Sequence, residues 1–291
     1  MLTLKEVSLR KGKRTYLDEV SFTAEAGRIT AIVGTRSAGR TELVRIIMGL
    51  IAADEGTIEL EDFELDFGDR QNFGYLPAER GGYPNMRVLD QIVYLARLHG
   101  ITLGAAERNA LTLLGHLELA DRGYAPLKNL SGAEIARVDI AATLAADPDV
   151  VVIDDAFAGL DAASLRLVTS LLRAHASSGV PVILATDDWE AAQTFADDVV
   201  ILGQGKVTAK GSVEKLLGDP HFRVETTDTD AAASALKSRT GISDVKTAGR
   251  ERVSFRANDA RSAAAAVAEL ENVKNFESVR PTLAEQYKEA L

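Results

Sequence analysis

The sequence predicts an α/β fold, in which a layered parallel sheet is followed by a smaller α+β domain. Three continuous apolar runs of strand length lie at 28–34, 149–155 and 180–186. Such runs are typical of strands that are covered on both faces. Helical stretches separate them, and strands that alternate with helices build a parallel sheet. A change of pattern near residue 220 indicates the second domain.

The first elements in chain order are two half-buried strands, a buried strand and a helix. Residues 2–8 and 18–24 alternate between apolar and polar side chains, which predicts half-buried strands. The run RITAIVG at 28–34 ends in glycine. TELVRIIMGL at 41–50 follows with apolar residues at helical spacing, the last of them Leu50. Together they predict a strand, a glycine-rich turn and a helix.

The middle of the chain is helical in pattern from about 86 to 146, which predicts a helical subdomain. We expect Pro148 to stop its last helix, because proline cannot continue a helix interior. The runs DVVVIDD at 149–155 and VPVILAT at 180–186 then predict two more buried strands, with a helix near 162–177 between them.

The C-terminal part predicts a small α+β domain, joined through the sequence GDPHF. FRVETT and VSFRA have the pattern of short strands, and AAASALKSRTG and ARSAAAAVAELE that of amphipathic helices. The alanine run in the second helix is ordered rather than low-complexity, because Val267, Leu270 and Val273 continue a helical face. The predicted domains are therefore 1–218 and 220–291.

Composition places the chain among ordinary globular proteins. Hydrophobic residues at 46% and charged residues at 26% exclude wholesale disorder. No apolar run approaches the roughly 18 residues of a membrane helix, and the first residues lack the apolar core of a signal peptide. The absence of cysteine excludes a disulfide framework and a thiol nucleophile. The net charge of −10 argues against a nucleic-acid partner, so we expect a cytosolic-type protein.

A glycine loop, GTRSAGRT, lies between the first buried strand and the helix after it. Its pattern is Gly34, four residues, Gly39, then Arg40 and Thr41. Successive backbone N–H groups and the positive end of the helix suit a phosphate, and the Thr41 hydroxyl is a ligand for magnesium. The alternative is a turn that needs glycine only for its backbone angles. The candidate nucleotide-binding residues are Gly34, Thr35, Arg36, Ser37, Ala38, Gly39, Arg40, Thr41 and Glu42.

Two carboxylates follow one another at the end of the strand at 149–155. A carboxylate in this position is costly unless it meets a cation or hydrogen-bond donors. Asp154 is placed to meet magnesium at the glycine loop, and Asp155 to position an attacking water. The alternative is an aspartate that caps the next element.

The sequence LSGAE at 130–134 opens the last helix of the helical subdomain. Ser131 and Glu134 have the spacing of a capping box, in which each side chain satisfies an orphan N–H of the first turn. The cap alone explains this motif locally. A functional role rests on its position in the chain, after the glycine loop and before Asp154.

These motifs resemble, in this order, those of the nucleotide-binding subunits of ABC transporters over about residues 1–218. The glycine loop is similar to the family's phosphate loop, LSGAE to its signature and DVVVIDD to its magnesium-carboxylate strand. AGLD, which ends at Asp161, matches the D-loop, and Asp187 in ATDD lies where the switch histidine is expected. The stretch GYLPAERGGYPNM places Ala78 at the Q-loop position. This stretch and the small domain ending PTLAEQYKEAL resemble a drug or sodium export-type subgroup.

The resemblance implies a P-loop ABC ATPase-type core with a helical subdomain, and the ligands ATP and Mg²⁺, with Thr41 and Asp154 holding the metal. It also implies a transmembrane permease partner, a peripheral location on the cytoplasmic side of the membrane, and a second nucleotide-binding subunit. Each ATP would lie between one chain's phosphate loop and the other's signature. The signature residues are Ser131, Gly132, Ala133 and Glu134.

Several positions depart from the family pattern where hydrolysis is performed. Arg40 replaces lysine, Ser37 replaces a glycine, and Ala78 replaces a side chain that contacts magnesium and water. Asp155 replaces the catalytic glutamate, which retracts the carboxylate by about 1 Å. Asp187 replaces the histidine that touches the terminal phosphate, and a carboxylate there repels it.

Two further departures affect binding. Glu134 puts a carboxylate near a helix end that should attract phosphate. Lys11 stands near the position of the aromatic that stacks on adenine, for which Tyr16 is the available substitute. We therefore expect a degenerate subunit with variant catalytic residues Asp155 and Asp187, paired with a competent one. The alternatives are an active homodimeric ATPase that uses Asp155 as base, and a non-hydrolysing scaffold or nucleotide sensor.

Overall fold

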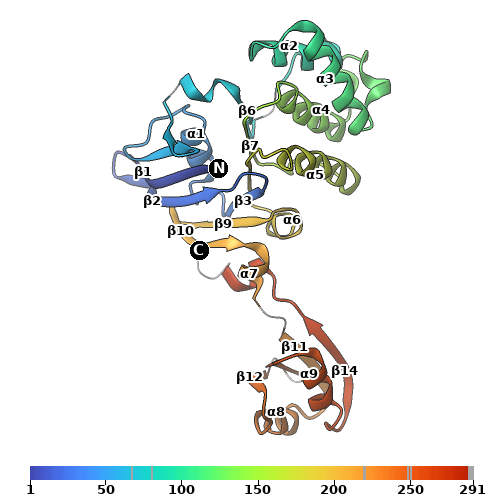
Figure 1. Cartoon of the computed structure of the whole chain (residues 1–291). Coiled ribbons are helices and arrows are strands. Elements are labelled where there is room, and N and C mark those ends of the chain that lie inside the picture. Colours follow the sequence, from blue (N-terminus) through green and yellow to red (C-terminus); the bar gives the residue numbers. More distant parts are fainter. Residues whose placement is uncertain (67, 80, 219–220, 248, 250, 288–291) are drawn as a thin grey trace. The chain divides into compact units, whose positions relative to one another are not determined.

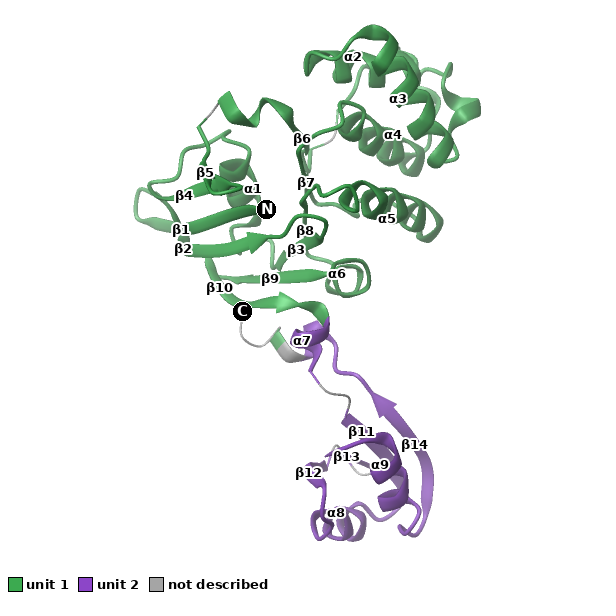
Figure 2. Cartoon of the chain, viewed as in Figure 1, with its two compact units in different colours: residues 1–213, 287–291 green, residues 214–286 purple. Residues whose placement is uncertain are grey.

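The structure is a computed structural model that describes residues 1–291 except 67, 80, 219–220, 248, 250 and 288–291. The chain forms two compact units, Met1–Val213 with Tyr287–Leu291, and Glu214–Gln286 (Figure 2). Part of the predicted linker GDPHF and the end of PTLAEQYKEAL lie outside the described residues. No helix within the described ranges is long and apolar enough to cross a bilayer.

A six-stranded sheet forms the centre of the first unit (Figure 1). Its strands in chain order are β3 (Ile29–Gly34), β6 (Phe73–Leu76), β7 (Val150–Asp154), β8 (Val182–Thr186), β9 (Asp198–Gly203) and β10 (Lys206–Ser212). They lie side by side in the order β10-β9-β3-β8-β7-β6, and all pairs are parallel except β10 with β9. Every residue of β3, β7 and β8 is buried. The predicted α/β fold is confirmed.

A second, antiparallel sheet shares its core with the first. It consists of β1 (Leu2–Lys11), β2 (Arg14–Ala24), β4 (Glu55–Leu60) and β5 (Phe63–Glu64), in the order β2-β1-β4-β5. Helix α1 (Arg40–Ile47) follows β3 after a loop of five residues, 35–39. One apolar cluster joins Phe22 of β2, Val44 of α1 and Ile183 of β8, so this cluster fixes the start of α1 against both sheets.

The remaining helices of the first unit are α2 (Val88–Leu98), α3 (Leu103–His116), α4 (Gly132–Leu144), α5 (Ala162–Ala176) and α6 (Trp189–Phe195), of which α2, α3 and α4 lie in the predicted helical subdomain. Helix α7 (Val213–Leu217) begins at the last residue before the second unit. Figure 1 shows α2, α3 and α4 gathered at one end. The region predicted as helical throughout is interrupted by short 3₁₀ turns at Ala120–Arg122 and Leu127–Asn129.

Helix α1 is shorter than the sequence predicts. It ends at Ile47, and Gly49 follows with a φ of 70°, in the left-handed region that ends helices. Leu50, which was expected to continue the apolar face, lies beyond the helix and is 56% exposed.

Among its described residues, the second unit contains a four-stranded antiparallel sheet and three helices besides most of α7. Its elements in chain order are β11 (His221–Thr226), α8 (Thr229–Lys237), β12 (Ile242–Thr247), β13 (Arg252–Ala257), α9 (Ala260–Val267), β14 (Val273–Val279) and α10 (Leu283–Tyr287). The sheet order β12-β13-β11-β14 with this succession is the split βαβ arrangement. Helix α9 ends at Val267, and Val273 begins β14. The predicted helical face is therefore wrong at Leu270 and Val273, which lie beyond the helix, and Asn272 between them has a φ of 59°.

Candidate functional site

The glycine loop connects β3 to α1. Gly39 has a φ of 96°, and a Cβ there would lie 2.5 Å from the backbone oxygen of Tyr16. A Cβ on Gly34 would lie 2.5 Å from the backbone oxygen of Leu202. Both positions therefore require glycine for steric reasons. The same turn places the loop at the N-terminus of α1, where a phosphate is favoured, and the two interpretations of the motif do not compete.

The middle of the loop is open to solvent. Thr35, Arg36 and Ser37 are exposed, whereas Ala38 is buried. The hydroxyl oxygens of Thr35 and Ser37 lie 3.5 Å apart. Ser37 is not among the residues with positive φ, so serine at this position causes no backbone strain of that kind.

Arg40 turns its guanidinium into the protein. Its side chain is 9% exposed, and its Nη2 lies 3.8 Å from Oδ2 of Asp187. The Nε and Nη1 atoms are buried and have no hydrogen-bond partner in the described part of the chain. Burial lowers the pKa of Arg40, while the carboxylates of Asp187, Asp155 and Asp154 act to raise it. The guanidinium remains charged, so it holds two unused donors beside the loop.

Asp187 follows β8 and lies beside two arginines of the loop. Besides Arg40, the Nε of Arg36 lies 3.6 Å from Oδ2 of Asp187. Strand β8 pairs directly with β3, which brings the ends of both strands together. The sequence predicts that this carboxylate repels a phosphate, and the structure adds that the loop itself offsets its charge.

Thr41 and Asp154 come together where β7 ends beside α1. Asp154 is 3% exposed. Burial raises the pKa of Asp154, and a hydrogen bond from the side chain of Thr41 opposes this shift. The Oδ2 atom of Asp154 is buried and has no hydrogen-bond partner among the described residues. Glu42 lies in the first turn of α1, where a carboxylate interacts favourably with the helix dipole.

Asp155 directly follows β7 with a φ of 55°. Aspartate tolerates this left-handed conformation better than most residues. Its backbone oxygen accepts a hydrogen bond from Ala158 N–H at 3.1 Å, and Ala156 N–H donates to the oxygen of Ala185 in β8. The backbone thus turns sharply at the position predicted for the residue that orients water.

A nucleotide polyphosphate with magnesium fits this group of residues. Buried polar atoms in native proteins normally have partners, yet the donors of Arg40 and one oxygen of Asp154 have none within the described residues. Guanidinium donors suit phosphate oxygens, and a carboxylate oxygen beside a threonine hydroxyl suits magnesium. These orphan atoms are a complementary set for such a ligand.

The signature forms the predicted capping box at the start of α4. The hydroxyl of Ser131 accepts the N–H of Glu134 at 3.3 Å, and Glu134 Oε2 accepts the N–H and the hydroxyl of Ser131 at 2.8 and 2.9 Å. Arg122 donates to Glu134 Oε1 at 2.9 Å. The hydrogen bonds from Ser131 lower the pKa of Glu134. Both donors of Ser131 are therefore engaged inside the chain. Gly132 is exposed and Ala133 half-buried beside them.

The D-loop residue Asp161 has a local structural role, and Ala78 at the Q-loop position makes no polar side-chain contact. Asp161 caps α5, because its Oδ1 accepts the N–H of Ser164 at 2.7 Å, and this bond lowers the pKa of Asp161. Ala78 follows β6, is exposed and carries no polar side chain. Its neighbour Glu79 is also exposed. Arg80 lies outside the described residues.

Tyr16, the substitute for the base-stacking aromatic, lies against the glycine loop, and two cations lie near its ring. The Nζ of Lys11 is 5.2 Å and the Cζ of Arg14 4.6 Å from the ring centroid. The sequence analysis did not single out Arg14, although Arg14 and Tyr16 are two residues apart in a strand and so share a face. Arg122 beside the signature was not singled out either, and no local pattern in the sequence indicates that contact.

Comparison with known proteins assigns the first unit. A family model described as ABC transporter matches residues 17–158. The uncharacterized ABC transporter ATP-binding protein YhaQ of Bacillus subtilis (strain 168) is 27% identical over 242 residues, covering 83% of this chain and 81% of that protein. The daunorubicin resistance ATP-binding protein DrrA3 of Streptomyces coeruleorubidus is 28% identical over 255 residues, covering 83% and 79%. This chain contains an ABC transporter ATP-binding domain.

Solved structures share the fold of this ABC transporter ATP-binding domain. An ATP binding subunit of an ABC transporter is 25% identical, with a TM-score of 0.67 over 74% of this chain and 91% of that one. The dimeric bacterial ABC transporter cassette MJ0796 is 22% identical, with a TM-score of 0.65 over 74% and 99%. The predicted P-loop ABC ATPase fold is confirmed. The chain is similar to the ATP-binding components of transport systems, and such domains bind ATP, generally with Mg²⁺ and beside transmembrane permease subunits.

Proposed function

We propose that this chain is a degenerate ATP-binding subunit of an ABC exporter, which binds nucleotide and hydrolyses it slowly or not at all. The observation that carries the proposal is the ion pair between Arg40 and Asp187. Two departures from the family pattern meet in it, so the loop's cation faces a carboxylate of the same chain. Residues that act as a unit lose far more together than any one loses alone.

Binding and chemistry are supported to different degrees by the residues of the site. The loop glycines and the orphan donors of Arg40 support phosphate binding. When bound with ATP, Mg²⁺ would be held by Thr41 and Asp154 and would neutralise phosphate charge. The carboxylate of Asp155 is one methylene shorter than a glutamate, and a displacement of about 1 Å costs about a hundredfold in rate. Ala78 contributes no side-chain ligand.

A second, competent ATP-binding subunit completes the proposal. In such a mixed pair the signature of this chain would face the partner's ATP. Glu134 already accepts both donors of Ser131, so this signature would support the partner's site less well than an unoccupied serine. Gly132 leaves open space beside it, with nothing within 4 Å of a Cβ built there.

The direction of transport is proposed from the relatives and from the second unit. Relatives of similar identity are named for linearmycin resistance, daunorubicin resistance and Nod factor export, although one is named for sulfate/thiosulfate import. The small α+β unit, 214–286, supports the export-type interpretation of the sequence. We propose a peripheral location on the cytoplasmic side of the membrane, held there by a permease.

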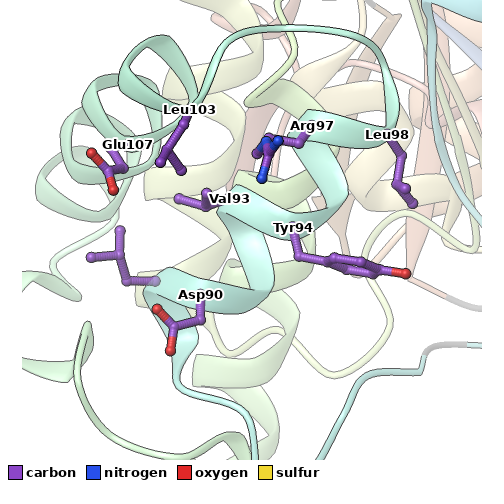
Figure 3. A pocket seen from close by; sticks show the side chains of 8 residues that line it. Asp90, Val93, Tyr94, Arg97, Leu98, Leu103 and Glu107 are labelled. Carbon is purple, nitrogen blue, oxygen red and sulfur yellow. The ribbon is translucent and has the colours of Figure 1, made fainter.

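A permease surface is proposed at the outer face of α2 and α3. A groove of about 430 Å³ lies between these helices, lined by Val93, Tyr94, Leu98 and Leu103 among others. Figure 3 shows Val93 and Leu103 facing this groove. Tyr94, Leu98 and Leu103 are 42%, 66% and 49% exposed, and Tyr83 packs edge-on against Tyr94 at 5.8 Å. Apolar side chains gathered in this way on a surface mark interaction sites.

The test is nucleotide binding and phosphate release by the purified chain, with and without Mg²⁺. The proposal expects binding with release far below the rates of about 1–10³ s⁻¹ that are usual for enzymes. A Thr41→Ala variant should lose the magnesium-dependent part of binding, and Thr112→Ala, an exposed threonine of α3, is its control. Release at an ordinary rate would favour the homodimeric ATPase with Asp155 as base. If the chain binds no nucleotide at all, the remaining alternative is a non-hydrolysing scaffold.

A further inference from the structure

The carboxylate of Asp187 occupies a place in the site that a phosphate group would use. It lies 3.8 Å from Arg40 and 3.6 Å from Arg36, the two arginines of the glycine loop. Both contacts run to the same oxygen, Oδ2. A carboxylate and a phosphate present similar charged oxygens to a guanidinium. The loop therefore holds one anionic group supplied by its own chain.

Arg40 has donors for a second anion beside this first one. Its Nη2 faces Asp187, whereas its Nε and Nη1 are buried without partners in the described structure. The Arg40 side chain is only 9% exposed. It therefore cannot leave the Asp187 carboxylate by turning out into solvent. An exposed ion pair such as that of Arg36, whose side chain is 94% exposed, breaks easily. A ligand that binds at the loop therefore meets the ion pair between Arg40 and Asp187.

The charge of the site also limits how many phosphates it accepts. Three carboxylates, those of Asp154, Asp155 and Asp187, act on the Arg40 guanidinium, and Arg36 is the other cation that acts on it. The cation of such a loop reaches the last two phosphates of a triphosphate. A diphosphate leaves the outer of these two positions to Asp187. A triphosphate brings a further charged group to it.

We propose that Asp187 stands in for the terminal phosphate, so that this site selects a nucleoside diphosphate over a nucleoside triphosphate. This inference rests on the proposed nucleotide-binding function of the loop. With a diphosphate bound, Arg40 spans the outer phosphate and the Asp187 carboxylate. With a triphosphate, like charges meet within a few ångströms of one guanidinium, and such repulsion is strong where solvent is partly excluded. Asp187 is thus a specificity-determining residue.

The experiment compares the dissociation constants of ADP and ATP for the full chain, measured by calorimetry under identical conditions, first in EDTA and then with Mg²⁺. The variant is Asp187→Asn, which keeps the size of the side chain and removes its charge, with Asp187→Ser as a second variant. The matched control is Glu190→Gln. Glu190 is an exposed acid three residues further along, in the first turn of α6.

We expect the wild-type chain to bind ADP more tightly than ATP. Both variants at Asp187 should shift the ratio of the two constants toward ATP by about tenfold or more, mainly through tighter ATP binding, and the control should keep the wild-type ratio. An unchanged ratio in both variants, with both nucleotides bound, would overturn the selection by Asp187 and leave the proposed function standing. If no version of the chain binds either nucleotide, both proposals fall.

Discussion

The Nη2 atom of Arg40 lies 3.8 Å from Oδ2 of Asp187, across the ends of β3 and β8. A lysine–histidine pair, as the family pattern has it, would put two proton donors at this point. Here one donor and one acceptor face each other. The charge reversal at Asp187 and the wider cation at Arg40 are therefore physically linked, and a change at one alters the other.

Restoring the two catalytic positions tests whether they limit turnover. We expect Asp155→Glu combined with Asp187→His to raise phosphate release by about a hundredfold, since a misplaced group costs about that much. Steady-state phosphate release at saturating ATP and Mg²⁺ measures the effect. Glu190→His, on the exposed side of α6, is the control and should leave release at baseline.

The contrary result is informative because the structure offers another cause. If the double variant releases phosphate no faster than wild type, the loop or the signature is the block. Glutamate at position 155 must also adopt the φ of 55° that aspartate accepts. The single variants therefore belong in the same series.

Part of the fold follows from the sequence because three of the buried parallel strands are continuous apolar runs. The runs at β3, β7 and β8 are continuously apolar, and the structure buries every residue of them. The sequence did not predict β4, β5, β6, β9, β10, β12 or β14. In β12 and β14, exposed charged and polar side chains break the pattern. The end of α1 was misplaced because Leu50 has helical spacing, while Gly49 turns the chain away.

The site was predictable as a set of positions and not as a set of contacts. The spacing around Gly34 and Gly39 and the strand end at Asp154 are local patterns. The pairing of Arg40 with Asp187 depends on β3 and β8 being neighbours, which no local pattern states. The contact of Arg122 with Glu134 has the same origin in tertiary structure.

Removing the buried charge of Asp154 should stabilise the nucleotide-free chain. Burial raises the pKa of Asp154, so the folded state binds the proton more tightly than the unfolded state. The ionised group therefore opposes folding at pH 7. We expect Asp154→Asn to raise the free energy of unfolding by about 1 kcal/mol and to abolish magnesium-dependent nucleotide binding. Asp147→Asn, at an exposed turn residue, should do neither; a lower melting temperature for Asp154→Asn would contradict the argument.

The capping box of α4 should contribute to stability in a pH-dependent way. We expect Ser131→Ala to lower the free energy of unfolding by about 1 kcal/mol. The pKa of Glu134 is lowered by its bonds to Ser131, so its contribution is present above the unfolded pKa and is lost as the pH falls through the folded one. Urea unfolding of wild type and Glu134→Gln at pH 7 and in the acid range measures this. If the difference in free energy of unfolding between wild type and Glu134→Gln grows as the pH falls, this expectation is wrong.

The groove between α2 and α3 should be needed for assembly with the permease. We expect Tyr94→Ser with Leu98→Ser to reduce copurification of the membrane subunit at least tenfold, because the change removes exposed apolar surface. Leu111→Ser is the control, since Leu111 is 54% exposed on α3 and does not line the groove. Unimpaired copurification of the double variant, or equal loss in the control, would place the contact elsewhere.

The second unit should unfold without taking the nucleotide site with it. Phe255 is 1% exposed and lies 5.8 Å from Phe222, ring centre to ring centre, in the core that α8 and α9 cover. Phe255→Ala leaves a cavity there and should cost about 3–5 kcal/mol, while Arg256→Ala, on an exposed neighbour, should cost little. Hydrogen exchange would show lost protection in β11 and β13, with β3 and β7 protected as in wild type. Loss of protection in β3 as well would mean that the two units unfold together, because a local defect spreads only through a shared cooperative unit.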